Sequence, residues 1–344
     1  MMFKRSSIFN SSIYKKVYDF IRLNKKMNHW AHKLMQSESL NRFPPYRALY
    51  ARMIRSKAKS LIASPLVLEF EITNMCNARC IMCPPQVHLG KDFLSQISFE
   101  RITQEGYEMG IRRMNLTGGE PLLDKSIYDK IRYAKSIGYE YVHMFSNGSI
   151  LTSLNREKLL DSGLDSFTIS VDSAIKEEYE AIRKRLKFDA VVNNIKELHR
   201  LRNEKALTKP MIRINMVALP ENKSSRQLFI STFSPYADIV EIIDSHNWAE
   251  NYSEDVSARE YSQQLRHPCH ILFVKAVINA HGYLKKCSVD MADHAAFVDL
   301  NQISLQEAWS NARLVDLKER MLRGQYNEPG CANCSHKESW WVDN

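Results

Sequence analysis

The sequence predicts an α/β protein with a parallel sheet, preceded by a helical extension and followed by a small cysteine-bearing domain. Three observations support this fold class. Between residues 65 and 245, six short strand patterns alternate with amphipathic helix patterns, which is typical of βαβ units. In residues 1–64, the apolar residues recur at helical spacing, and no alternation typical of strands is evident. Four of the seven cysteines follow residue 246. We therefore expect three parts: residues 1–64, 65–245 and 246–344.

The first part predicts a basic helical extension. Apolar residues recur at roughly helical spacing from Tyr14 to Leu34, with lysines between them, and a second helix is expected over residues 46–63, after Pro44-Pro45. Residues 1–60 hold fourteen Lys or Arg and two acidic residues, a net charge of +12, and the remainder of the chain carries −3. Two interpretations stay open. The helices pack on the neighbouring domain with a solvated basic face, or residues 1–40 contact an anionic membrane or another acidic partner.

The first strand of the sheet leads into three closely spaced cysteines. Residues 66–73 alternate in polarity and predict a strand. Cys76, Cys80 and Cys83 follow, with three and then two residues between them. Three thiolates hold three irons of a four-iron cluster and leave the fourth iron open, as catalytic metal sites require. Thiolates also suit zinc, so this loop alone leaves both metals open.

Five further strands are predicted along the chain. They cover residues 114–116, 141–145, 166–172, 211–219 and 238–243, with helices near 99–109, 126–136, 155–161, 188–202 and 225–233. The strand at 114–116 ends in the glycine turn Gly118-Gly119-Glu120-Pro121, and the next ends in Ser146-Asn147-Gly148.

Polar residues recur at every second position on two of these strands. Ser166, Thr168, Ser170 and Asp172 share one face of their strand, and Arg213 shares a face with Asn215. Because the apolar faces should pack on the helices, we expect both polar stripes to line the interior of the domain.

The last part of the chain contains a second cysteine set: Cys269, Cys287, Cys331 and Cys334. Residues 271–278 and 283–287 predict a β-hairpin that brings Cys269 and Cys287 to the same end. A helix over residues 304–322 leads to the closing CxxC pair. Four thiolates complete the coordination of a four-iron cluster or of zinc.

The composition is typical of a globular protein without membrane-spanning segments. Hydrophobic residues make up 44% and charged residues 25%, and no apolar run reaches the length of a membrane span. The N-terminus has no apolar region of the signal-peptide kind. Cysteines spaced as metal ligands indicate a reducing compartment, so we expect a cytoplasmic protein. The basic segment lies outside the α/β part, and no nucleic-acid partner is expected.

The CxxxCxxC loop after the first strand and the GGEP turn after the second together resemble the radical SAM superfamily. The resemblance implies a partial (β/α)6 TIM-like barrel with its site at the C-terminal ends of the strands. It implies a [4Fe–4S] cluster on Cys76, Cys80 and Cys83, with S-adenosylmethionine (SAM) on the open iron. It also implies cofactor contacts from Met82, Gly118, Gly119, Glu120, Pro121, Ser146, Asn147, Ser170, Asp172 and Arg213.

The C-terminal cysteines resemble the SPASM/twitch extension of radical SAM enzymes in its one-cluster form. This implies an auxiliary [4Fe–4S] cluster on Cys269, Cys287, Cys331 and Cys334, suited to electron transfer. Their spacing is similar to that of the 2-deoxy-scyllo-inosamine dehydrogenases, over roughly residues 66–336.

That resemblance implies an oxidoreductase. SAM is cleaved to a 5′-deoxyadenosyl radical, which abstracts hydrogen from a polar, sugar-like or phosphorylated small molecule, and the outcome is a dehydrogenation. A donor such as flavodoxin or ferredoxin supplies the reducing electron. The resemblance does not assign a catalytic base.

Three other functions fit parts of the sequence. A radical SAM maturase would modify a peptide or protein, but no strand-rich peptide-binding domain is evident in residues 1–64. The GTP cyclases of molybdenum-cofactor synthesis have a different auxiliary cysteine spacing and a GGR-like tail. A non-enzymatic iron–sulfur or zinc scaffold would not need the complete set of SAM motifs.

Overall fold

The computed structural model describes residues 52, 54–84, 90–246, 248, 268–290, 296–332 and 334. The chain divides into two compact units, one of residues 1–57 with 339–344 and the other of Ala58–Glu338. The first predicted helix and the proposed membrane contact of residues 1–40 lie outside the described residues. Within the second predicted helix, residues 54–60 are helical. Across the described ranges, no helix combines the length and the apolar character that crossing a bilayer requires.

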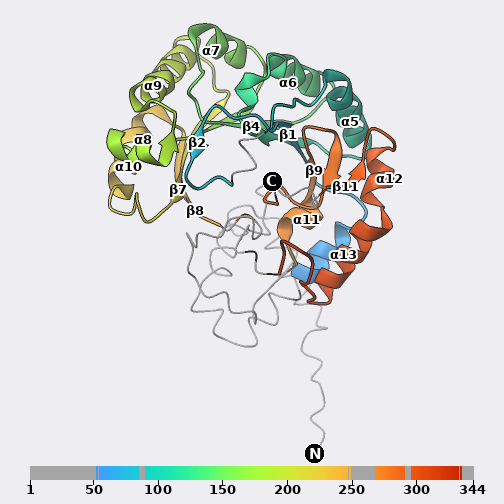
Figure 1. Ribbon diagram of the computed structural model, residues 1–344. Coiled ribbons are helices and arrows are strands. Elements are labelled where there is room, and N and C mark those ends of the chain that lie inside the picture. The colour runs from blue at the N-terminus through green and yellow to red at the C-terminus, as the bar shows by residue number, and fades with distance from the viewer. Residues whose placement is uncertain are drawn as a thin grey trace, which may run out of the picture. The chain divides into compact units, whose positions relative to one another are not determined.

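A nine-stranded sheet organises the larger unit, in the order β11-β10-β9-β1-β3-β4-β5-β7-β8. Six neighbouring strands run parallel and confirm the predicted partial barrel: β1 (Val67–Thr73), β3 (Arg113–Gly118), β4 (Tyr141–Ser146), β5 (Ser166–Ser170), β7 (Met211–Ala218) and β8 (Ile239–Asp244). Helices lie outside the curved sheet (Figure 1): α5 (Gln96–Glu108), α6 (Ile127–Ser136), α7 (Ser153–Leu160), α8 (Lys176–Ile182), α9 (Phe188–Glu204) and α10 (Arg226–Phe233).

The main core lies between the sheet and these helices. On β1, Phe70 packs against Phe99 of α5 with ring centroids 4.8 Å apart, and both side chains are fully buried. Leu68 and Ile72 share that face, since side chains alternate along a strand. Glu69 and Glu71 therefore point to the opposite, inner face of the sheet. Helix α5 begins after Ser95, whose hydroxyl accepts a hydrogen bond from the Ser98 amide at 3.0 Å.

One βα unit contains elements that the sequence did not reveal. Between β5 and α9 lie the seven-residue helix α8 and the short strand β6 (Arg183–Lys184). Strand β6 pairs antiparallel with β2 (Arg79–Cys80), which belongs to the first cysteine loop. Helix α8 buries only Tyr179 and Ile182 and has no side-chain cap, so it is too short for a periodic pattern to stand out.

The C-terminal strands extend the barrel sheet. Strand β9 (Lys275–Ile278) pairs parallel with β1, and β10 (Tyr283–Lys285) returns antiparallel beside β9, as the predicted hairpin requires. The predicted strand 271–278 is wrong in its first half, because His270–Val274 form the short helix α11. All five residues of α11 are buried, and an apolar run without alternation does not distinguish a buried strand from a buried helix.

The predicted helix 304–322 is two helices, α12 (Leu305–Trp309) and α13 (Ala312–Leu322). The break occurs at Asn311, whose side chain accepts a hydrogen bond from the Arg313 amide at 3.0 Å and caps the second helix. Ser304 and Glu307 form a capping box at the start of the first.

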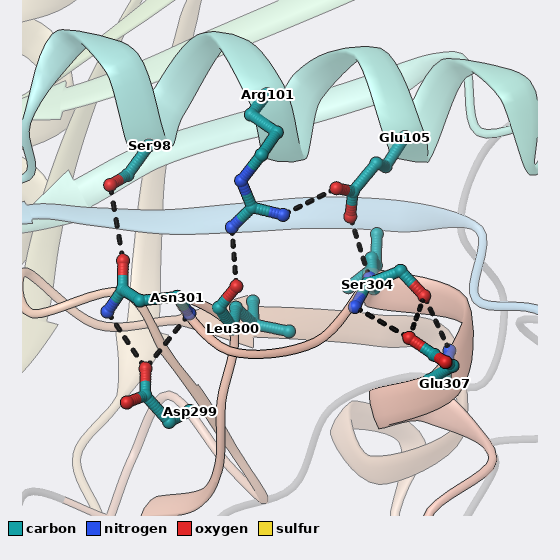
Figure 2. A network of polar contacts seen from close by, with 9 residues as sticks. Ser98, Arg101, Glu105, Asp299, Leu300, Asn301, Ser304 and Glu307 are labelled. Atoms are coloured by element: carbon teal, nitrogen blue, oxygen red, sulfur yellow. Dashed lines mark hydrogen bonds and ion pairs between the residues drawn. The ribbon is translucent and has the colours of Figure 1, made fainter.

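A polar network fastens these C-terminal elements to α5 (Figure 2). Arg101 ion-pairs with Glu105 on the same helix and donates to the Leu300 carbonyl just after β11 (Ala296–Asp299). Glu105 accepts a hydrogen bond from the Leu305 amide at 2.7 Å, at the first turn of α12. The segment that follows β11 is thereby held against the barrel.

Candidate functional site

The first three cysteines lie in the loop that follows β1. Cys80 belongs to β2 and pairs with Arg183 of β6, and the Arg183 guanidinium lies 3.8 Å from the Cys80 sulfur. The Ala78 amide donates to the Cys76 sulfur at 3.4 Å. The thiols of Cys80 and Cys83 share a hydrogen bond. Short loop contacts and the small β2–β6 sheet thus present three sulfurs together.

Their ionisation differs sharply. The hydrogen bond with Cys83, together with the charge of Arg183, lowers the pKa of Cys80 to about 7. Burial raises the pKa of Cys76 to about 11, and the bond to Cys80 and burial raise that of Cys83. Protein metal sites bind cysteine as thiolate. A bound cationic centre would therefore supply the charge that this loop lacks for holding three thiolates at neutral pH.

Arg183 is a site residue that the sequence reasoning missed. Its Nε lies 2.7 Å from Asp172 Oδ2, and both side chains are buried. Asp172 also accepts a hydrogen bond from the Val217 amide at 2.7 Å, and its backbone is left-handed, with φ of 66°. Asp172 thus aims Arg183 at the cysteine loop. The basic run 183–185 was the available signal, but a charge run usually marks a solvated face.

The glycine turn after β3 packs directly on the backbone that leads into the cysteine loop. A Cβ at Gly118 would lie 2.4 Å from the Thr73 carbonyl oxygen, and one at Gly119 would lie 2.0 Å from that of Met75. Instead, the Gly119 amide donates to the Thr73 carbonyl at 2.7 Å and the Glu120 amide to the Met75 carbonyl at 2.8 Å. Only glycine permits this approach.

Glu120 joins this turn to the end of β4. The side chain is fully buried and accepts hydrogen bonds from Ser146 Oγ at 2.8 Å and from the Asn147 amide at 2.7 Å. Asn147 in turn donates to Asn77 Oδ1 at 2.8 Å, within the cysteine loop. Burial raises the pKa of Glu120, opposed by these hydrogen bonds. The structure therefore brings together the cysteine loop, the glycine turn and the Ser146-Asn147 turn, and adds Asn77.

The other predicted cofactor contacts lie around this centre. Met82 is buried, and its carbonyl accepts a hydrogen bond from Trp248 Nε1 at 2.6 Å. Pro121 starts the short 3-10 helix Pro121–Leu123. Ser170 is the last residue of β5, in register with Asn215 of β7.

Charged and polar side chains cover the inner face of the sheet. Glu69 lies 3.1 Å from Lys275 Nζ and accepts from Asn115 at 2.9 Å. Arg213, predicted from the sequence, contacts both oxygens of Glu241 at 3.0 Å. The predicted polar lining is therefore present at Thr168 and Arg213, and the face is more strongly charged than the two stripes suggested. The prediction is wrong for Asp172, because β5 ends at Ser170 and Asp172 pairs with Arg183 beyond the strand.

His143 lies on this inner face and was not singled out from the sequence. Its Nε2 lies 2.8 Å from Thr168 Oγ1, and its ring stacks on Phe145 with centroids 4.3 Å apart. Burial, with the nearby positive charges of Arg213 and Lys275, lowers the pKa of His143 to about 3. The imidazole is therefore uncharged at neutral pH.

Cys269 and Cys334 act electrostatically on both Cys287 and Cys331, although the four cysteines come from three separate segments of the sequence. Burial, then the charges of Cys269 and Cys334, raise the pKa of Cys331 to about 12 and also raise that of Cys287. Cys269 and Cys287 pack against an apolar cluster of Ile271, Val277 and Val289. All seven cysteines are free thiols. Among the described residues, no three His, Cys, Asp or Glu side chains enclose a site for a single metal ion.

Both cysteine sets fall within segments that match known protein families. Residues 70–232 match the radical SAM superfamily, and residues 269–335 match the SPASM iron–sulfur cluster-binding domain. A radical SAM domain implies a [4Fe–4S] cluster and SAM, and a SPASM domain implies auxiliary iron–sulfur binding. Free thiols in two groups, one in a short loop and one of four members, fit those cofactors.

Curated relatives match over a shorter stretch. The GTP 3′,8-cyclase of Staphylococcus haemolyticus is 34% identical over 127 residues, 34% of this chain and 37% of that protein. The GTP 3′,8-cyclase of Alkaliphilus metalliredigens is 32% identical over 139 residues, 39% of this chain and 43% of that protein. In each of these two alignments, the chain spans less than half of the relative's length.

Two solved structures share the fold over most of the chain. SuiB of Streptococcus suis, bound to its precursor peptide SuiA, aligns with a TM-score of 0.63 at 13% identity, over 88% of this chain and 80% of SuiB. BtrN in complex with AdoMet and 2-DOIA aligns with a TM-score of 0.54 at 15% identity, over 82% of this chain and 98% of BtrN.

Proposed function

We propose that this chain, whose residues 70–232 match the radical SAM superfamily and 269–335 the SPASM domain, is an oxidoreductase that dehydrogenates a polar, hydroxyl-bearing small molecule. When bound, SAM and the first cluster would supply hydrogen-atom abstraction and the auxiliary cluster one-electron oxidation, so that the substrate would lose a hydrogen atom, an electron and, to solvent, a hydroxyl proton. The protein's own residues hold these groups, orient the substrate and exclude water.

Three groups of residues would divide this work. Cys76, Cys80 and Cys83 would hold the SAM-bound cluster, with Arg183 supporting Cys80 at 3.8 Å. The Gly118-Gly119 backbone, bare of side chains, would receive the methionine end of SAM. Glu120 would act indirectly, since its carboxylate is occupied by Ser146 and the Asn147 amide.

The composition of the inner sheet face is the observation that carries the proposal. Asn115, His143 and Thr168 present neutral hydrogen-bonding groups between the Glu69–Lys275 and Arg213–Glu241 ion pairs. A substrate with several hydroxyls can take over such contacts one by one. An apolar substrate that displaced them would offer no new partner, at a cost of about 1–3 kcal/mol for each buried polar group left unpaired. Neutral His143 accepts or donates a hydrogen bond without bringing a charge.

Anaerobic turnover with a substrate panel tests the proposal. Reconstituted protein, SAM and a reductant are incubated with cyclitols and nucleotide sugars, and 5′-deoxyadenosine and products are followed by mass spectrometry. We expect 5′-deoxyadenosine in step with a product that has lost two hydrogens. Deuterium at the attacked carbon should appear in the 5′-deoxyadenosine. GTP and a set of precursor peptides complete the panel, and turnover of either instead would contradict the small-molecule assignment.

Peptide modification is the second candidate, and the position of β8 favours it. Among the described residues, β8 is the last strand of the sheet, and Ile243 on it is exposed. An extended peptide binds to such an edge through main-chain hydrogen bonds. This would bring its side chains beside Glu241, at the rim of the polar inner face. Turnover of peptides in the same panel would select this candidate.

A further inference from the structure

A buried ion pair brackets one of the auxiliary cysteines. Lys286 precedes Cys287, and its Nζ lies 2.8 Å from Asp290 Oδ2, three residues beyond the cysteine. The two side chains are 1% and 0% exposed. Between them, the Val289 amide donates to the Cys287 sulfur at 3.2 Å, and the Asp290 amide also bonds to it. The ion pair therefore closes a tight turn around this sulfur.

The same lysine reaches the other half of the cysteine set. Lys286 Nζ donates to the carbonyl of Pro329, two residues before Cys331. Cys287 and Cys331 come from segments separated by β11, α12 and α13, so this bond ties together two parts of the site. The positive charge of Lys286 also opposes the upward shift of the Cys331 pKa. The Lys286 ammonium group therefore contacts the backbone of the segment that carries Cys331, while its own backbone adjoins Cys287.

Stability alone does not explain this arrangement. Burying two charges carries a large desolvation penalty, and well-packed apolar residues in place of a buried ion pair are often neutral or stabilising. A cation in a low-dielectric interior acts strongly on a neighbouring redox centre, because the electrostatic energy varies inversely with the dielectric constant. Charge and hydrogen bonds to the sulfurs set the potentials of iron–sulfur clusters.

We propose that Lys286 is a positioning and tuning residue of the auxiliary cluster. It joins the Cys287 and Cys331 segments, and its charge, partly offset by Asp290, raises the cluster's reduction potential. This inference rests on the proposed function, in which that cluster takes the substrate electron. A cluster that gains an electron becomes more negative, so a buried cation favours the reduced state and makes the cluster a better acceptor.

The inference predicts opposite shifts of the auxiliary cluster's reduction potential when Lys286 and Asp290 are substituted. The full-length Cys76→Ala/Cys80→Ala/Cys83→Ala variant is designed to retain only the auxiliary cluster, whose potential is then measured by redox titration with electron paramagnetic resonance. On this background, Lys286→Met should lower the potential and Asp290→Asn should raise it, while Lys286→Arg should stay near the starting value. A purely structural ion pair would cause cluster loss in both Lys286→Met and Asp290→Asn, without opposite shifts.

Lys130→Met is the matched control. Lys130 and Asp124 form another buried lysine–aspartate pair, 2.6 Å apart, in the barrel region. Removing Lys130 should leave the auxiliary potential unchanged. If Lys286→Met does not retain iron, the test rests on Asp290→Asn alone. An auxiliary-cluster potential in that variant that is unchanged or lower overturns the inference. Because no SAM or substrate is present, this result is independent of whether the proposed dehydrogenation is correct.

Discussion

At the scale of single residues, the glycine turn gives the sharpest prediction. Gly118→Ala should weaken SAM binding and lower thermal stability, because its Cβ would meet the Thr73 carbonyl at 2.4 Å and its φ of 113° is strained for alanine. Gly110→Ala is the control, since φ is 87° there but nothing lies within 4 Å. The control should cost only the backbone term of about 1–2 kcal/mol. Calorimetric titration measures the SAM affinity of both variants, and thermal unfolding measures their stability. An equal change of SAM affinity in Gly118→Ala and Gly110→Ala would place the SAM site elsewhere.

A second prediction concerns Lys318, which α13 buries completely against Trp309, with Nζ 3.2 Å from the ring centroid. Burial lowers the pKa of Lys318 to about 7. Between that value and the unfolded pKa of about 10.4, the unfolded chain binds a proton that the folded chain releases, so stability should rise with pH. Lys318→Met should remove this contribution, of at most about 1.4 kcal/mol per pH unit. Urea denaturation at several pH values measures it, and parallel pH profiles for the two proteins would contradict it.

At the scale of elements, the contact between α5 and α12 is open to direct test. Glu105→Ala removes the carboxylate that accepts a hydrogen bond from the Leu305 amide. Leu305 is at the start of α12, where backbone amides have no acceptor within the helix, so this amide would lose its partner. We expect a loss of about 1–3 kcal/mol in the free energy of unfolding and faster amide exchange in residues 299–309. Glu108→Ala, which removes only an exposed bond to Gln104 on the same helix, is the control and should change stability by less than about 0.5 kcal/mol. Equal effects would mean that the network in Figure 2 adds nothing.

Elements also show what the sequence does and does not reveal. The six parallel strands carry strong patterns, and the glycine turn and cysteine loop mark the ends of two of them, so the barrel and its centre were predictable. Helix α11 and the break at Asn311 were not, because a buried apolar run is ambiguous and a mid-segment cap looks like any polar residue. Arg183 and His143 were missed for another reason. Their roles depend on partners, Asp172 and Thr168, that only the fold brings close.

At the scale of the whole molecule, the two cysteine sets predict the iron content. Wild-type protein should hold about eight irons, and Cys76→Ala/Cys80→Ala/Cys83→Ala about four, with no cleavage of SAM. Substituting Cys269, Cys287, Cys331 and Cys334 should remove the other four while leaving the first cluster able to cleave SAM. Iron and sulfide assays with Mössbauer spectroscopy measure this. Stoichiometric zinc in place of iron in either site would contradict it.

The pairing of β9 with β1 limits which truncations and domain exchanges this protein tolerates. Strand β1, which leads to the first cysteine loop, is hydrogen-bonded to β3 on one side and to β9 on the other. A chain cut after residue 245 would leave that second side bare, and an exposed apolar edge invites association with other chains. The C-terminal region is therefore not an interchangeable module. A chimera that borrows another SPASM domain would need a donor strand matched to Val67–Phe70 as well as matching cysteines.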